Sequence, residues 1–144
     1  MLTTTVAPLT TWGLLPLRLV VGLVFLVHGG QKLFQFGLGG TAGFLGSLGV
    51  PAPTLAAVVV TAVELLGGLA LIFGAFTRVV ALVLAVHMLV AIVLVHIKAG
   101  FFLPQGYEFA LTLVGANLTL VLTGAGAVSV DAALEPHPGA RARG

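Results

Sequence analysis

Four long apolar stretches run through the chain, separated by segments rich in glycine, proline and polar residues. They cover about residues 13–36, 53–74, 78–97 and 107–123. A helix needs about 20 apolar residues, within a range of roughly 17 to 25, to cross the hydrocarbon core of a bilayer. Because every stretch reaches that range, the pattern predicts an all-α fold: an integral membrane antiparallel four-helix bundle.

Three segments lie outside these stretches. Residues 1–11 are rich in threonine and carry no basic residue, so we expect a frayed lead and a retained first helix rather than a cleaved signal peptide. Residues 37–53 are glycine-rich, uncharged and too apolar for a solvated linker, which favours a short amphipathic or re-entrant segment packed on the bundle. Residues 132–144 are predicted to be a disordered tail, and residues 1–131 a single transmembrane domain.

The composition supports the membrane assignment. Of the 144 residues, 59% are hydrophobic and 7% are charged, whereas soluble domains carry about 25% charged residues. The mean hydropathy is +1.22. Cysteine is absent from the sequence, which excludes disulfides, thiolate metal ligands and thiol chemistry on this chain.

The few charges indicate an orientation. Six basic residues against four acidic ones fit the positive-inside rule better than nucleic-acid binding, for which a clustered basic face is expected. Arg78, Arg141 and Arg143 fall on the side of the termini, so we expect cytoplasmic termini in a bacterial inner membrane. Arg18 and Arg78 lie near helix ends, where we expect their side chains to reach the lipid headgroups.

Each predicted span carries one polar residue at a similar depth. Counted at about 1.5 Å per residue, His28, Glu64, His87 and Asn117 lie roughly 12 to 16 Å below one boundary. Ionisable groups at such depth are costly and usually face a partner, a cavity or a ligand. For Asn117 and His87 a purely interhelical hydrogen bond is the simpler interpretation.

A second polar tier lies closer to the same boundary. It consists of Gln31, Lys32, His96, Lys98, Tyr107 and Glu108. With both tiers in the outer half of the bundle, the sequence predicts a cavity that opens toward the outer face. His87 and His96 are nine residues apart, which on a regular helix places them on opposite sides. We therefore expect that they do not line one site.

Glu64 is the strongest candidate for chemistry. A carboxylate at mid-bilayer must be protonated or paired with a cation, since burying the bare charge is too costly. Lys32 and His28 lie within reach of its depth. The sequence leaves two interpretations of a Lys32–Glu64 pair open: an architectural link between helices, or a site for protons and a ligand.

Metal and nucleotide sites are disfavoured. His28, Glu64 and His87 have the residue types of a non-haem iron site, and histidines of different helices can hold haem. No His-x-x-x-His or Glu-x-x-His spacing supports either group, so we predict no metal site. The glycines of residues 37–49 follow no strand, which excludes a dinucleotide fingerprint.

Several short motifs, in order from Leu14 to about Asp131, resemble the DoxX family of small bacterial membrane proteins. They are Arg18-Leu19-x-x-Gly22-x-x-Phe25, His28-Gly29-x-Gln31-Lys32-Leu33-Phe34, Glu64-x-x-Gly67-Gly68, Gly74-x-x-Thr77-Arg78, His96-x-x-x-Gly100-Phe101-Phe102, Gly106-Tyr107-Glu108-Phe109 and Gly124-x-Gly126-x-x-Ser129-x-Asp131. The resemblance implies a four-helix membrane protein related to the DoxD subunit of thiosulfate:quinone oxidoreductase. It also implies a link to membrane oxidoreductase complexes and to oxidative stress. His87 and Asn117 lie outside the family pattern.

Two functions follow as expectations. The first is a membrane subunit of a quinone-linked redox system, in which Glu64, Lys32 and His28 are catalytic and Gln31, His87, His96 and Glu108 bind the ligand. A quinone is the cofactor or substrate class that suits such a cavity. The second is a non-catalytic scaffold, assembly or lipophile-binding subunit. In either case the partners are the lipid bilayer and other membrane or redox subunits or further copies of the chain, and no nucleic acid.

Overall fold

The computed structural model describes residues 6–135, and the part described consists of helices and connecting turns. In chain order the elements are α1 (Val6–Gly30), η1 (Gln31–Gln35), α2 (Gly37–Ser47), α3 (Pro53–Phe73), α4 (Thr77–Ala91), η2 (Ile92–His96), η3 (Ile97–Ala99), α5 (Glu108–Thr123) and α6 (Val130–Leu134). The segments η1 and η2 are π-helical and continue α1 and α4. The predicted all-α membrane bundle is confirmed.

Three continuous helical runs are long and apolar enough to cross a membrane: Thr11–Gln35, Pro53–Phe73 and Thr77–Ala99. The fourth predicted span corresponds to α5, an apolar helix of 16 residues. At about 1.5 Å per residue, α5 is some 24 Å long and therefore shorter than a typical hydrocarbon core.

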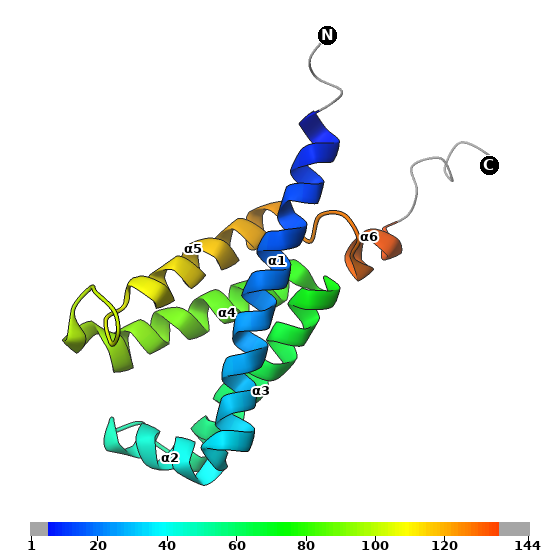
Figure 1. Cartoon of the computed structure of the whole chain (residues 1–144). Coiled ribbons are helices and arrows are strands. Elements are labelled where there is room, and N and C mark those ends of the chain that lie inside the picture. Colours follow the sequence, from blue (N-terminus) through cyan, green and yellow to red (C-terminus); the bar gives the residue numbers. More distant parts are fainter. Residues whose placement is uncertain (1–5, 136–144) are drawn as a thin grey trace.

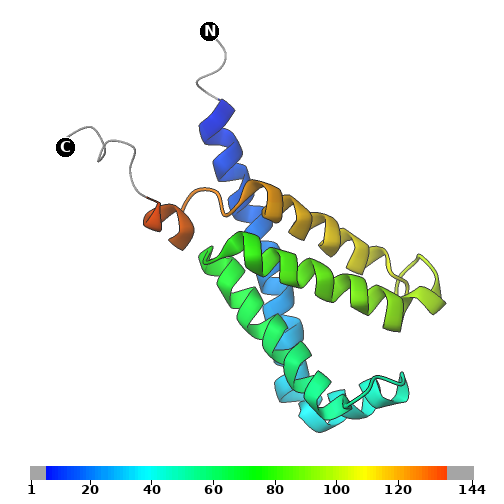
Figure 2. The same cartoon turned by 180° about the vertical axis from the view of Figure 1, so that it is seen from behind.

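The spans form two pairs that meet at one end of the molecule. Helix α1 packs along α3, and α4 packs along α5. Figures 1 and 2 show the pairs diverging from the end where α6 lies, with α2 turned against the far end of α3. We call the end with α6 the closed end, and the end with η1, α2 and η2 the open end.

Glycines set the close approach of α1 and α3. A Cβ atom at Gly68 would lie 2.5 Å from the backbone nitrogen of Leu26, and one at Gly22 would lie 2.8 Å from the carbonyl oxygen of Gly68. Real Cβ atoms do not come so close to backbone. Small residues let membrane helices pack through their backbones, which fixes this pair tightly.

The closed end is held by residues that follow α5. Arg18 is 1% exposed, and its Nη1 and Nη2 atoms donate to the carbonyl oxygens of Ala125 and Val128 at 2.8 Å each. The expectation that Arg18 reaches lipid headgroups is wrong. The reason is that the chain after α5 folds back over α1 and supplies backbone carbonyl acceptors. No pattern of residues in the sequence predicts this fold-back.

Asp131 of α6 completes this end. Its carboxylate accepts hydrogen bonds from the backbone N–H groups of Phe76 (2.7 Å) and Thr77 (2.8 Å), at the start of α4. Partial burial raises the pKa of Asp131, but these hydrogen bonds and the nearby Arg18 guanidinium lower it by more. The net pKa is therefore below its ordinary value, and the carboxylate is ionised at neutral pH.

Element boundaries differ from the expectation at both ends of the chain. Helix α1 begins at Val6, inside the segment expected to be a frayed lead, and residues 1–5 lie outside the described residues. The expected tail, 132–144, starts within α6, and residues 136–144 also lie outside them. Residues 37–47 of the glycine-rich segment form a regular helix, α2.

Candidate functional site

A buried carboxylate joins three elements at the open end. Glu64 of α3 accepts a hydrogen bond from the Lys32 ammonium of η1, with Nζ 2.7 Å from Oε2. On its other side, Nε2 of His87 from α4 lies 2.9 Å from Oε1. The side chain of Glu64 is 5% exposed, against 22% for Lys32 and 14% for His87.

This arrangement satisfies both carboxylate oxygens of Glu64. A buried charge is tolerated when it is paired and hydrogen-bonded, and here each oxygen has its own partner. Glu64 is therefore covered by Lys32 and His87, and these two side chains provide the more accessible polar surface of the group. Its carboxylate fixes the direction of the ammonium and the tautomer of the imidazole, because His87 must donate from Nε2.

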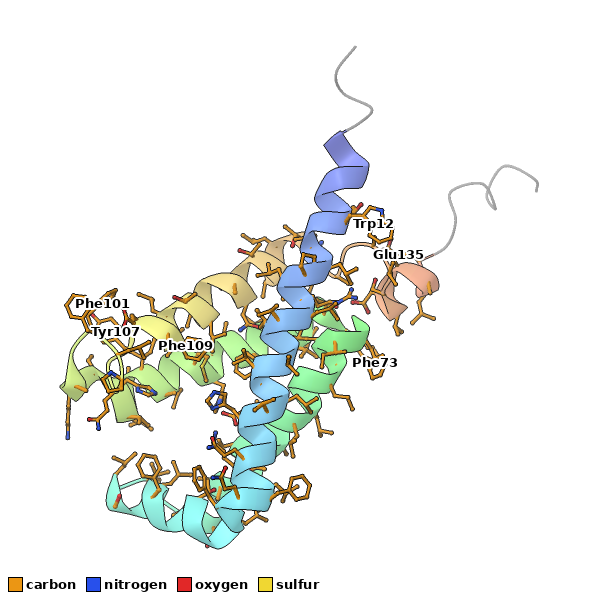
Figure 3. The ribbon with its side chains drawn as sticks, in the orientation of Figure 1. Trp12, Phe73, Phe101, Tyr107, Phe109 and Glu135 are labelled. Atoms are coloured by element: carbon orange, nitrogen blue, oxygen red, sulfur yellow. The ribbon has the colours of Figure 1, made fainter. Side chains whose placement is uncertain are left out.

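The polar group ends a cavity of about 350 Å³ that lies between the two helix pairs. Its wall is mostly apolar and draws on every long helix, with representative contributions from Phe25, Val60, Met88, Leu94, Phe109 and Leu113. The volume falls at the lower end of the range for small-molecule sites, which combine apolar walls with few polar groups. In Figure 3, Phe109 lies on α5, whereas Phe101 and Tyr107 lie in the loop before α5 and farther from α1.

The cavity also brings His87 and His96 together, so the expectation that they face opposite sides is wrong. The reason is the π-helical segment η2, Ile92–His96, which separates them. A π turn holds about one residue more than an α turn, so the angle between the two side chains falls from about 180° to about 80°. Both histidines line the cavity. Such turns occur frequently at functional sites.

His28 lines the same cavity from α1, where its ring centroid lies 6.4 Å from that of Phe109. His96 borders the cavity beside the loop before α5, and its Nδ1 lies 2.9 Å from the carbonyl oxygen of Gln105. Together with Lys32, Glu64 and His87, the two histidines give this cavity five ionisable side chains.

The remaining candidates lie elsewhere. Gln31 and Glu108 are not among the residues that line the cavity. The Oε1 atom of Glu108 accepts a hydrogen bond from the backbone N–H of Leu103 at 2.6 Å, which braces the loop before α5. Asn117 is fully buried, and its amide donates to the carbonyl oxygen of Leu113 on its own helix at 2.8 Å. Across residues 6–135, no three histidine or carboxylate side chains are placed to hold a metal ion.

Helix α2 supplies a wall that the sequence reasoning missed. Thr41, Phe44 and Leu45 line the cavity from this helix. Their i, i+3, i+4 spacing is typical of one face of a helix. The glycines around them weakened the helical pattern, so the sequence did not identify this face. The hydroxyl of Thr41 donates to the carbonyl oxygen of Gly37 at 3.0 Å, so this residue contributes mainly its methyl-bearing surface.

The arrangement is suited to a lipophilic molecule with a polar head. Lys32 keeps two ammonium hydrogens beyond the one on Glu64, since an ammonium has three donors. His87 presents its second ring nitrogen, and His28 and His96 add imidazoles. These groups can donate or accept hydrogen bonds and exchange protons, whereas the apolar wall accommodates a hydrocarbon tail.

Comparison with known proteins places the chain among bacterial membrane proteins. The sequence model of the DoxX family matches residues 13–97. CatD of Bacillus subtilis, named provisionally as an oxidoreductase, is 39% identical over 119 residues, which cover 83% of this chain and 84% of CatD. The inner membrane protein YphA of Escherichia coli is 32% identical over 124 residues, covering 82% of this chain and 87% of YphA. No solved structure matches the chain.

Proposed function

The chain belongs to the DoxX family of membrane proteins, and from this premise we propose that it is the membrane subunit of a quinone-linked oxidoreductase system. The cavity between the helix pairs receives the head of a quinone. The observation that carries the proposal is the Lys32–Glu64–His87 group in the wall of a mostly apolar cavity. A relative that is named an oxidoreductase supports the same class of function.

The proposed chemistry is proton handling. Reduction of a quinone to a quinol consumes two electrons and two protons, and each carbonyl oxygen becomes a hydroxyl. Lys32 delivers one proton to a ring oxygen, and His87 delivers the other from Nδ1 in its imidazolium form, while Glu64 orients both donors. These side chains carry no electrons, so the redox group of a partner protein supplies them.

The location follows the same proposal. The protein lies in the bacterial cytoplasmic membrane, as do the relatives named inner membrane proteins. Residues 1–131 form its single transmembrane domain, with both termini in the cytoplasm, because the positive-inside rule applied to the sequence positions of Arg78, Arg141 and Arg143 favours that orientation. The cavity then opens in the outer half of the bilayer.

One observation favours a second candidate function, a non-catalytic scaffold or assembly subunit. Both oxygens of Glu64 are satisfied by the protein itself, as in an architectural ion pair between helices. In that case the glutamate is needed for stability and not for any ligand.

Quinone binding separates the two candidates. The protein is purified in nanodiscs and titrated with decylubiquinone. We expect saturable binding that weakens at least tenfold in Glu64→Gln and in Lys32→Met, because each change removes or misdirects a donor to the ring oxygen. Glu135→Gln, an exposed carboxylate on the far side of the closed end, is the matched control.

Unchanged binding in Glu64→Gln, accompanied by a lower melting temperature, would contradict the proposal and support the scaffold. Wild-type protein that shows no saturable binding would do the same. Mass spectrometry of the gently solubilised protein adds an independent readout, since a co-purifying quinone or redox partner supports the oxidoreductase function.

A further inference from the structure

His96 differs from the other histidines of the cavity because its tautomer is fixed by backbone. Its Nδ1 lies 2.9 Å from the carbonyl oxygen of Gln105. A carbonyl oxygen can only accept a hydrogen bond, so Nδ1 carries the proton. In the neutral imidazole the other nitrogen, Nε2, is then a hydrogen-bond acceptor.

The cavity therefore has two polar groups of different character. Around Glu64, the ammonium of Lys32 is a donor only, and the neutral His87 adds an acceptor at Nδ1, so both kinds of group are present. Beside the loop before α5, His96 offers an acceptor nitrogen among Leu103, Pro104 and Gly106, which add no side-chain donor. The remaining ionisable groups of the cavity are Glu64, whose oxygens are both occupied, and His28.

We infer that the cavity selects lipophilic phenols, including quinols, by accepting the hydrogen bond of their hydroxyl group at Nε2 of His96. This inference rests on the proposed function and adds to it a ligand class, namely the hydroxyl-bearing form of an aromatic lipophile. A ligand with an acceptor oxygen at one end and a hydroxyl at the other satisfies both Lys32 and His96. A bound ligand covers Nε2, and an acceptor that is covered without a donor would cost binding energy, which is the basis of the selectivity.

The test compares two probes that differ in one hydrogen bond. Tritiated 4-hexylphenol and tritiated 4-hexylanisole share the ring and tail, but only the phenol can donate. Each is bound directly to the protein in nanodiscs, with concentrations corrected for partition into empty nanodiscs. We expect the phenol to bind about tenfold more tightly than the ether, in line with one net hydrogen bond.

Two substitutions separate the two nitrogens of His96. In His96→Asn the amide NH₂ can still donate to the Gln105 carbonyl, but the Nε2 acceptor is gone, so the phenol preference should fall to about onefold. His96→Gln places an amide oxygen near the position of Nε2 and should retain part of the preference. Glu135→Gln is the control, and melting curves confirm that each variant folds.

Equal binding of phenol and ether to the wild type would overturn the inference, as would an unchanged preference in His96→Asn. Loss of the preference in His28→Asn but not in His96→Asn would assign the hydroxyl to His28 and would also overturn it. If neither probe binds saturably, the cavity takes no lipophile and the proposed function fails as well. If both bind equally, only the present inference fails.

Discussion

The two ends of the molecule each contain a buried charge, and they use it differently. At the closed end, Arg18 and Asp131 are held by backbone: carbonyl oxygens of Ala125 and Val128, and N–H groups of Phe76 and Thr77. At the open end, Glu64 is held by titratable side chains that line a cavity. Backbone partners cannot exchange protons with a ligand, whereas lysine and histidine can.

The contrast shows that a buried charge is not by itself a sign of function. Arg18 is 1% exposed, yet its hydrogen bonds join α1 to the connection between α5 and α6, and it does not line the cavity. Glu64 differs because its hydrogen-bond partners, Lys32 and His87, are titratable side chains that line a mostly apolar cavity. The following substitutions test this difference, beginning with the largest expected effect.

Replacing Arg18 should damage the fold most. Arg18→Met leaves the carbonyl groups of Ala125 and Val128 without their donors, and we expect a loss of about 3 kcal/mol in the free energy of unfolding. Thermal unfolding in detergent measures it. Arg78→Met is the control, because Arg78 also donates to two carbonyl groups but is exposed. Equal losses in both variants would contradict the assigned role of burial.

The open end should tolerate removal of both partners of the Lys32–Glu64 pair better than removal of one partner. Lys32→Met or Glu64→Leu alone strands a charge, and we expect each to cost about 2 kcal/mol of stability. The double variant should recover most of this loss, because no unpaired ion remains beside the cavity. Quinone binding should be lost in all three variants. A double variant that binds quinone normally would show that the pair is architectural.

Asp131 should make the closed end sensitive to acid. Because its folded-state pKa lies below the ordinary value of 3.8, its stabilising effect is complete above that value and is lost as the pH falls through the lower folded-state pKa. Asp131→Asn should cost about 1 kcal/mol at neutral pH, as expected for a lost helix cap, and should flatten the stability profile below about pH 4. Chemical unfolding between pH 2 and 7 measures both effects. A parallel profile for wild type and variant would contradict the assignment.

The smallest effect is expected at the apolar wall. Phe44→Ala removes half-exposed ring surface from α2, and we expect quinone affinity to fall about fivefold, corresponding to ~1 kcal/mol of apolar contact. Stability should change little because Phe44 is 51% exposed in the protein. Titration and thermal unfolding of the same preparation separate the two. A larger loss of stability than of affinity would indicate that α2 is structural only.

Much of the fold could be predicted from the apolar pattern. Pro53, Gly74 and the polar residues near Glu108 mark helix ends that the structure places within a residue or two of the expected positions. Equal depth along the helices placed His87 level with Glu64, which it contacts, but Asn117 at the same depth bonds within α5. The Lys32–Glu64 pair follows from these depths together with the high cost of a lone carboxylate.

Two features could not be read from the sequence. The wider turn of η2 brings His96 to the side of His87, and no residue between Ile92 and His96 marks such a turn. The return of residues 124–131 across α1 creates the partners of Arg18 from backbone atoms, which carry no sequence signature. Both depend on tertiary packing, whereas periodicity reports only the regular helix.

The most direct test of the proposed cavity is photolabelling with an azido-quinone in nanodiscs, followed by mass spectrometric mapping of the labelled residues. We expect labels on the cavity walls, at Phe44 and Leu45 of α2 and at Leu94 and Val95 of η2, with suppression by excess decylubiquinone and by Glu64→Gln. Labels spread over the lipid-facing side chains of α1 and α4, without suppression by the quinone, would contradict the proposed cavity.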